Sequence, residues 1–109
     1  MENEALVLER TAQLINALQA DYEKLRGPDV REEALDHVLA IGKKYIKLIQ
    51  ISWGSRSIHA FIDRTTGEVY KPASFKAPAK HVRYKLLDEQ SFQQCIDEAD
   101  WAGGYLYIK

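Results

Sequence analysis

The sequence predicts a single α+β domain, residues 1–109, in which helices pack on one face of an antiparallel sheet. Its length is that of one domain, and its content of 46% hydrophobic and 28% charged residues is typical of a globular chain. Apolar residues recur every three or four positions near the N-terminus, as in a helix. In the middle they form short β-branched and aromatic runs, as in strands. The expected order of elements is α-α-β-β-β-α-β, with the helices together on one side.

The first helix is expected over residues 5–26. Its apolar positions repeat at spacings of three and four and would form one buried stripe made of Leu8, Ala12, Ile15, Leu18, Tyr22 and Leu25. Gly27 accepts a left-handed cap and Pro28 cannot continue a helix, so the helix should end there.

A second, shorter helix is expected over residues 30–41. Asp29 and Glu32 have the spacing of a capping box, in which each side chain accepts a hydrogen bond from the other residue's backbone N–H. Gly42 suits the end of this helix. The two helices would then form a helical hairpin over residues 1–41.

Residues 42–85 are expected to form a basic, three-stranded antiparallel meander followed by an extended loop. The predicted strands are rich in β-branched and aromatic residues and cover residues 45–53, 57–63 and 68–71. Strict alternation in the second strand gives two faces, with Ile58, Ala60 and Ile62 on one and His59 and Phe61 on the other. Gly67 is placed for a turn that needs positive φ.

The loop after the third strand, residues 72–85, shows no clear period. Pro72 and Pro78 favour extended or polyproline-like backbone there. Four cations project from this loop: Lys76, Lys80, Arg83 and Lys85.

Residues 86–109 are expected to contain one more helix and a final strand. Asp88 would cap a helix over residues 89–99, with Cys95 on its inner face. A glycine pair would break the chain before a strand over residues 105–108.

Charge is segregated along the chain, although the net charge is only -1. Residues 1–41 hold nine acidic and four basic side chains, and residues 86–109 hold five acidic and one basic. In residues 42–85, ten basic side chains face only Asp63 and Glu68. The ten are Lys43, Lys44, Lys47, Arg56, Arg64, Lys71, Lys76, Lys80, Arg83 and Lys85. A local positive field of this kind guides the choice of partner.

The sequence does not indicate an enzyme. It contains no hydrolase, metalloprotease or phosphate-binding motif, so we expect no enzyme and no cofactor, although an active site assembled from scattered residues remains open. His37, His59 and His81 have no metal-ligand spacing and are interpreted as unrelated structural histidines. Cys95 is expected to be a buried, inert thiol.

The location expected from the sequence is the cytoplasm. The first residues carry Glu2 and Glu4 where a signal peptide would be basic. No apolar run is long enough to span a membrane, and a single cysteine cannot form an intramolecular disulfide.

The basic, aromatic middle of the chain predicts a nucleic-acid-binding protein that prefers single strands. Bases would stack on exposed rings while cations follow the phosphates. The expected site residues are Lys47, Arg56, Phe61, Lys71, Phe75, Lys76, Lys80, Arg83 and Tyr84.

Two alternatives remain open at this point. In the first, the rings are packed under the helices, the lysines keep the sheet from pairing with other sheets, and the role is protein binding or structural. In the second, the acidic helices of another copy neutralise the basic surface in a homodimer. The orientation of Phe61, Tyr70 and Phe75 separates these readings: exposed rings beside lysines favour nucleic acid, and buried rings favour a scaffold.

The stretch Gly67–Lys80 (GEVYKPASFKAPAK), with Lys44–Lys47 and His59–Asp63, resembles a small-protein family of tailed bacteriophages, including marine and cyanobacterial phages. The resemblance implies a viral accessory protein made in a bacterial cytoplasm, acting on nucleic acid or on a host protein. That family has no assigned activity, so the resemblance supplies no catalytic residues.

Overall fold

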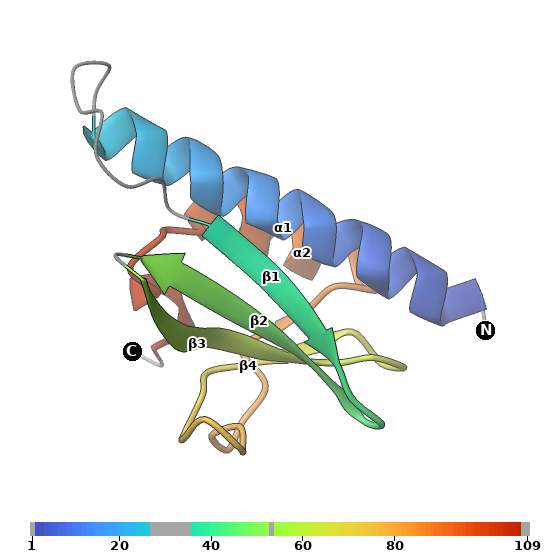
Figure 1. The fold of residues 1–109 in the computed structure, drawn as a ribbon. Helices are drawn as coiled ribbons and strands as arrows, with labels where there is room; N and C mark the ends of the chain where they lie inside the picture. Colours follow the sequence, from blue (N-terminus) through green and yellow to red (C-terminus); the bar gives the residue numbers. More distant parts are fainter. Residues whose placement is uncertain (1, 27–35, 53, 108–109) are drawn as a thin grey trace.

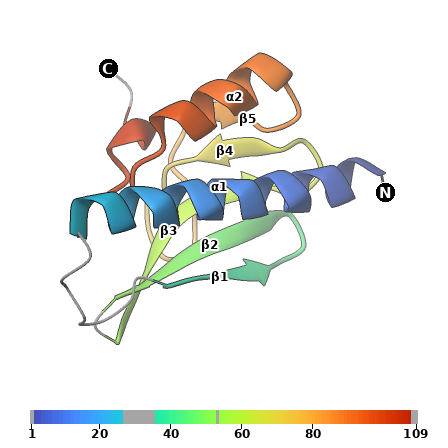
Figure 2. The ribbon, with the colours of Figure 1, turned by 90° about the horizontal axis from the view of Figure 1, so that it is seen from above.

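Two helices cover one face of a five-stranded antiparallel sheet in the computed structural model, which describes residues 2–26, 36–52 and 54–107 (Figures 1 and 2). The elements in chain order are α1 (Glu2–Arg26), β1 (Asp36–Ile41), β2 (Tyr45–Ser52), β3 (Ser55–Asp63), β4 (Glu68–Tyr70), β5 (Tyr84–Lys85), α2 (Glu89–Glu98) and the 3-10 helix η1 (Gly104–Leu106). The strands lie in the sheet in chain order, each antiparallel to its neighbours. The predicted α+β class and antiparallel sheet are confirmed.

The buried stripe of α1 contains Leu18, as predicted, but is shifted by one residue before it. Val7, Thr11, Leu14 and Leu18 are fully buried, whereas Leu8 is 36% exposed. The Thr11 hydroxyl donates to the backbone carbonyl of Val7 at 2.7 Å, so this stripe can include a polar residue without leaving it unsatisfied. Leu8 instead lines a small pocket together with Ile41 of β1 and Ile46 of β2.

The predicted second helix is wrong where the structure describes it, because residues 36–41 form β1. Residues 30–35 of that prediction lie outside the described residues. β1 pairs along its whole length with β2 in a regular register, from Asp36 opposite Ile51 to Ile41 opposite Ile46. A short apolar run permits either a helix or a strand, and pairing with β2 decides between them.

The strand β3 contains a β-bulge that changes which side chains face the helices. Leu48 of β2 is opposite Ala60, but the next residue, Ile49, is opposite Ile58, so His59 is the extra residue. His59 therefore shares the helix side of the sheet with Ala60, and Ile58 points to the other side. The predicted strict alternation, with His59 and Phe61 on one face, is wrong at His59.

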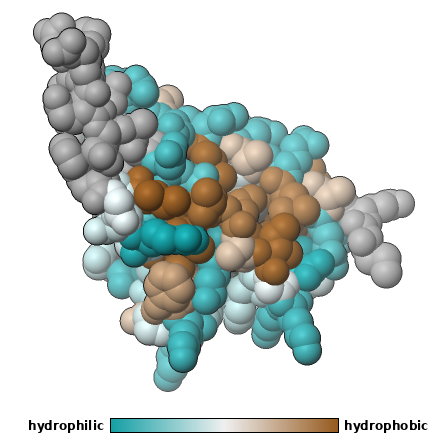
Figure 3. Space-filling model, in the orientation of Figure 1, coloured by the Kyte–Doolittle hydropathy of each residue, from teal (hydrophilic) through white to brown (hydrophobic). Residues whose placement is uncertain are grey.

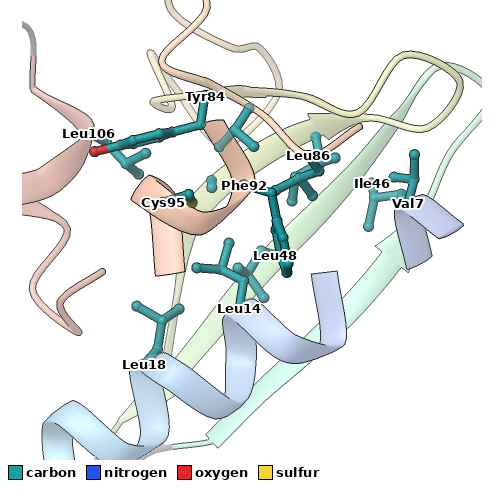
Figure 4. Packing of buried hydrophobic residues seen from close by; sticks show 13 residues of the cluster. Val7, Leu14, Leu18, Ile46, Leu48, Tyr84, Leu86, Phe92, Cys95 and Leu106 are labelled. Atoms are coloured by element: carbon teal, nitrogen blue, oxygen red, sulfur yellow. The ribbon is translucent and has the colours of Figure 1, made fainter. Parts of the chain in front are cut away.

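The hydrophobic core lies between the sheet and the two helices (Figure 4). Leu14 and Leu18 of α1, Phe92 and Cys95 of α2, and Leu106 of η1 all pack into it. The sheet contributes buried side chains from its helix face, namely Ile46, Leu48, Ala60, Ile62, Val69 and Tyr84. A second apolar layer, with Ile49 and Phe61, is buried on the opposite face.

Two local signals in the C-terminal half have the predicted effect. Asp88 caps α2, since its side chain accepts hydrogen bonds from the backbone N–H groups of Gln90 and Ser91. Gly67 has φ of 76°, and a Cβ there would lie 3.1 Å from Leu87 Cγ, so the turn needs glycine.

The predicted final strand over residues 105–108 is wrong in its described part. Gly104–Leu106 form η1, which follows Gly103 in the left-handed region with φ of 86°. The Asp100 carboxylate accepts from the backbone N–H groups of Gly104 and Tyr105, each at 3.1 Å, and so holds the turn. In the part of the chain that the structure describes, no helix is both long enough and apolar enough to cross a membrane.

Candidate functional site

Two grooves adjoin around the start of β3 and the segment that follows β4. The larger has a volume of about 340 Å³ and the smaller about 190 Å³. Both are lined by Ser57, Ile58 and Pro72, so they share a wall. We call them together the joined groove; its main side chains are Arg56, Ser57, Ile58, Lys71, Pro72, Phe75, Trp101 and Tyr107.

The joined groove carries two exposed rings, each beside a lysine. Phe75 is 53% exposed and Tyr107 is 60% exposed. Lys47 Nζ lies 5.0 Å from the centre of the Phe75 ring, and Lys71 Nζ lies 4.8 Å from the centre of the Tyr107 ring. These distances are those of cation–π contacts, so ring and positive charge are presented together at both ends.

The segment after β4 holds Phe75 at the tip of a tight turn. The backbone N–H of Ala73 donates to the carbonyl of Ala77 at 3.0 Å, and that of Ala79 donates to Lys71 at 2.7 Å. The Ser74 hydroxyl accepts from the backbone N–H of Ala77 at 3.2 Å. These bonds fix the backbone on both sides of the ring, so little ordering is needed before Phe75 can contact a ligand.

The charge lining the joined groove has one sign. Arg56 is exposed and Lys71 is half-buried, and no described residue lining either groove is acidic. Exposed carboxylates are found elsewhere, for example at Glu89 and Asp97 of α2. The groove therefore favours an anionic partner.

Four of the nine predicted site residues come together here. Arg56, Lys71 and Phe75 line the joined groove, and Lys47 lies over Phe75. Two more of the nine, Lys76 and Lys80, are exposed on the same segment but do not line the groove. The structure thus gathers cations from β2, β3 and the segment after β4.

The other three predicted site residues have structural roles instead. The Phe61 ring is 1% exposed, and Tyr84 is 7% exposed on the helix side, where its hydroxyl donates to Glu98. The Arg83 guanidinium donates to backbone carbonyls, including that of Leu106 at 2.6 Å from Nε. Phe61 and Tyr84 therefore offer no ring for stacking, and Arg83 holds the C-terminal segment in place.

Sequence reasoning missed Tyr107 and Trp101, which both line the groove. Trp101 also packs edge-on against Tyr22 of α1, with ring centres 5.2 Å apart. The aromatic residues on both sides of the glycine pair could have indicated a site. The strand predicted over residues 105–108 assigned Tyr107 to the sheet instead. Trp53, another ring that the sequence offers, lies outside the described residues.

Two histidines that the sequence treats as unrelated are neighbours under α1. The rings of His37 and His59 are 6.1 Å apart, and His59 Nε2 lies 2.8 Å from the hydroxyl of Tyr105. Burial, together with the neighbouring His37, lowers the pKa of His59 to about 4, while Asp100 opposes the shift. Burial also lowers the pKa of His37, although a hydrogen bond with Gln50 and the charge of Asp36 oppose this.

The hydrogen bonds of His37 fit a neutral ring. Its Nδ1 is 2.9 Å from the Gln19 amide nitrogen and its Nε2 is 3.2 Å from the Gln50 amide oxygen, so one ring nitrogen accepts and the other donates. Among the described residues, no three histidine, cysteine or acidic side chains are grouped as a metal site would require. The pair is a buried polar network between α1, β1 and β3.

Cys95 is buried in α2, as predicted. Burial, with the nearby Glu98, raises the pKa of its thiol to about 12. The reactive thiolate is therefore scarce at neutral pH, which argues against a nucleophilic role.

Comparison with known families extends over nearly the whole chain. A family described as a family of unknown function, DUF7717, matches residues 1–108. The searches of curated proteins and of solved structures found no match. The expectation of an uncharacterised family is confirmed, whereas the phage origin stays a prediction. The chain belongs to DUF7717, a family of unknown function.

Proposed function

We propose that the joined groove binds single-stranded nucleic acid. The observation that carries this proposal is the lining of the groove: two exposed rings, each beside a lysine, with Arg56 of β3 in the wall and no carboxylate among the described lining residues. Proteins that bind single strands without sequence preference combine such rings with a positive groove.

The rings supply the contact that distinguishes a single strand from a duplex. A base can stack on Phe75 or Tyr107 only when its face is free, and in a duplex that face is covered by its neighbours. Stacking on one ring contributes about 1–3 kcal/mol. A ligand that reaches both rings would therefore bind with useful affinity even though Phe61 and Tyr84 are buried.

The cations supply affinity for the backbone of the ligand. Arg56 and Lys71 line the groove. Lys47 lies over the Phe75 ring, and Lys76 and Lys80 follow Phe75 in the same segment. Neutralised phosphates release counterions, which makes this part of the affinity sensitive to salt. The acidic side chains of the helices repel phosphate and would confine the ligand to the groove.

The resemblance to tailed-phage proteins gives this proposal its biological context. In that context the chain is an accessory protein that acts in a bacterial cytoplasm on single strands of DNA or RNA. The runner-up is a protein-interaction module that binds and modulates a host protein. We propose no catalytic role and no cofactor for the groove.

Fluorescence titration with a labelled oligo-dT and a duplex of equal length tests the proposal. We expect measurable binding of the single strand at low salt, weaker binding of the duplex, and residual single-strand binding at high salt because stacking does not depend on counterions. Absence of oligo-dT binding even at low salt would rule the proposal out and leave the host-protein alternative.

Substitutions at Phe75 separate stacking from apolar contact. Phe75→Leu retains an apolar side chain but loses the ring, and should weaken oligo-dT binding roughly 5- to 150-fold, which corresponds to the free energy of one stacked base. Phe75→Trp retains the ring and should bind as the parent does. Lys85→Ala removes an exposed cation outside the groove and is the control. Equal affinity of the leucine and tryptophan variants would mean that Phe75 does not stack.

A further inference from the structure

The strand β1 forms an edge of the sheet that the described residues leave unpaired. Its only partner among these residues is β2, and the opposite edge is the short strand β5, against which α2 packs. Figure 2 shows β1 lying to one side of α1, so the helix does not cover this edge. An open edge presents backbone donors and acceptors that another strand can use.

Among the described residues, β1 shows few of the features by which proteins prevent sheets from pairing. The six residues of β1 include no proline and no lysine, and the register with β2 contains no bulge. Its own side chains Val38 and Ile41 are 39% and 54% exposed, and Leu8 of α1, which lies near Ile41, is 36% exposed. Figure 3 shows apolar surface gathered over α1 and β1 on this side of the molecule.

The hairpin between β1 and β2 determines which residues point their backbone groups outward. The N–H of Gly42 donates to the carbonyl of Tyr45 at 2.9 Å. Hydrogen-bonded and non-hydrogen-bonded pairs alternate along an antiparallel ladder, so the even-numbered residues of β1 bond to β2. The N–H and C=O groups of His37, Leu39 and Ile41 therefore point to the open edge.

The charges flanking β1 select an antiparallel partner with the same sequence. Asp36 begins the strand, and Lys43 and Lys44 follow its end. If a second copy pairs antiparallel, Asp36 of each copy lies near the lysines of the other. A parallel pairing would instead bring like charges together, which is unfavourable.

We infer that two copies of the chain associate through their β1 strands, antiparallel, to form one continuous sheet. A twofold axis perpendicular to the sheet keeps the helix faces on the same side, so opposed residues must come from the same face. The longest pairing of the outward groups places Leu39 opposite Leu39 of the second copy and His37 opposite Ile41 of the second copy. Val38 then lies opposite Ala40 of the second copy.

The inference does not depend on the proposed function, because β1 contributes no residue to the joined groove. We assign the partner as a second copy because two antiparallel β1 strands complement each other. Their outward backbone groups pair, their apolar side chains meet, and Asp36 of each copy lies near the lysines of the other. The acidic helices do not need to cover the basic surface in this arrangement, in contrast to the homodimer considered from the sequence.

Sedimentation equilibrium over concentrations from roughly 1 µM to roughly 1 mM tests the association. We expect a concentration-dependent dimer. Ile41→Lys introduces a charge that blocks edge pairing, and should raise the dimer dissociation constant at least about tenfold. Gln93→Lys adds the same charge on exposed α2 and should leave the dimer unchanged. A monomer at every concentration, or a dimer that Ile41→Lys does not weaken, overturns the inference.

Disulfide cross-linking tests the register. Residues opposed in a non-hydrogen-bonded pair have close Cβ atoms, so an equimolar mixture of Val38→Cys and Ala40→Cys chains should cross-link on mild oxidation. Ala40→Cys alone should cross-link much less. Cross-linking of neither the mixture nor a single variant, in a chain that sediments as a dimer, would assign the dimer to another surface and overturn the β1 pairing.

Discussion

His59 is a buried polar residue whose environment is set by the bulge in β3. It is 7% exposed and its imidazole nitrogen is 2.8 Å from the hydroxyl of Tyr105, which belongs to η1. Tyr105 is itself shielded, and burial raises its pKa well above the usual value. The tyrosine therefore stays neutral, and protonation of His59 would place a charge in a buried site, which the nearby Asp100 offsets only in part.

Folding stability should fall on mild acidification because of His59. The unfolded chain takes up a proton near the ordinary histidine pKa of 6.5, while burial holds the pKa in the folded state at about 4. The stability that depends on a neutral His59 is therefore fully present above pH 6.5 and is lost as the pH falls toward 4. Between pH 7 and pH 5 we expect a loss of about 2 kcal/mol, to which His37 adds in the same direction. Urea unfolding at the two pH values measures it.

The variant His59→Gln provides the comparison for this measurement. Glutamine cannot take up a proton, so the difference in unfolding free energy between pH 7 and pH 5 should shrink, although the variant is less stable at both. A difference as large as in the parent would show that other groups are responsible.

The role of a single residue could be predicted from the sequence where it depends only on neighbours in the chain. The burial of a side chain could not, because it depends on which distant segments cover it. Asp88 and Gly67 have the predicted roles because capping and turn geometry involve only their chain neighbours. Phe61 and Tyr84 are buried by segments distant in sequence. Composition alone does not show whether an aromatic residue on a strand faces a ligand or a core.

At the scale of elements, periodicity was sufficient for the helices but not for β1. α1 and α2 begin and end within a few residues of the predictions because long apolar repeats and caps are local signals. The run in β1 is too short for its period to distinguish strand from helix, and the capping-box pattern before it favoured a helix. Pairing with β2, which is not visible in the run itself, decides its structure.

Truncation of Leu18 tests the packing of α1. Leu18 is fully buried among α2 and sheet residues of the core, so Leu18→Ala should lower the unfolding free energy by about 2–5 kcal/mol. The measurement is the midpoint and slope of urea denaturation. Gln13→Ala, on the exposed side of the same helix, should change it by less than about 0.5 kcal/mol. Equal effects of the two substitutions would mean that α1 does not pack through this stripe.

At the scale of the whole molecule, the charge pattern of the sequence becomes a separation in space. The helices, with eight of the sixteen acidic side chains, lie on one side of the sheet (Figure 1), whereas no described residue that lines the joined groove is acidic. The sequence predicted the segregation of charge along the chain. It did not predict the groove, because its walls come from β3, the segment after β4 and the C-terminal residues.

The salt dependence of binding tests whether this segregation guides a ligand. Alanine substitution of Lys71, Lys76 and Lys80 together should weaken oligo-dT binding and lower the slope of log K against log salt by about two, since each lost contact to a single strand contributes about 0.7. A control with equal net charge replaces the exposed cations Lys24, Lys43 and Lys85. Equal slopes for the two triple variants would remove the segment after β4 from the binding surface.

The extra residue in β3, His59, allows the groove residues and the core residues of this strand to change independently during evolution. Ile58 and Ala60 are almost adjacent in sequence, yet Ile58 forms part of the groove wall and Ala60 belongs to the core. Substitutions at Arg56 and Ile58 can therefore change what the groove binds without repacking Ala60 and Ile62. Loss of one residue at His59 would be different in kind, because it would turn every side chain before it to the opposite face. Members of the family should thus differ at Arg56 and Ile58 according to what the groove binds, while keeping the length of this strand constant.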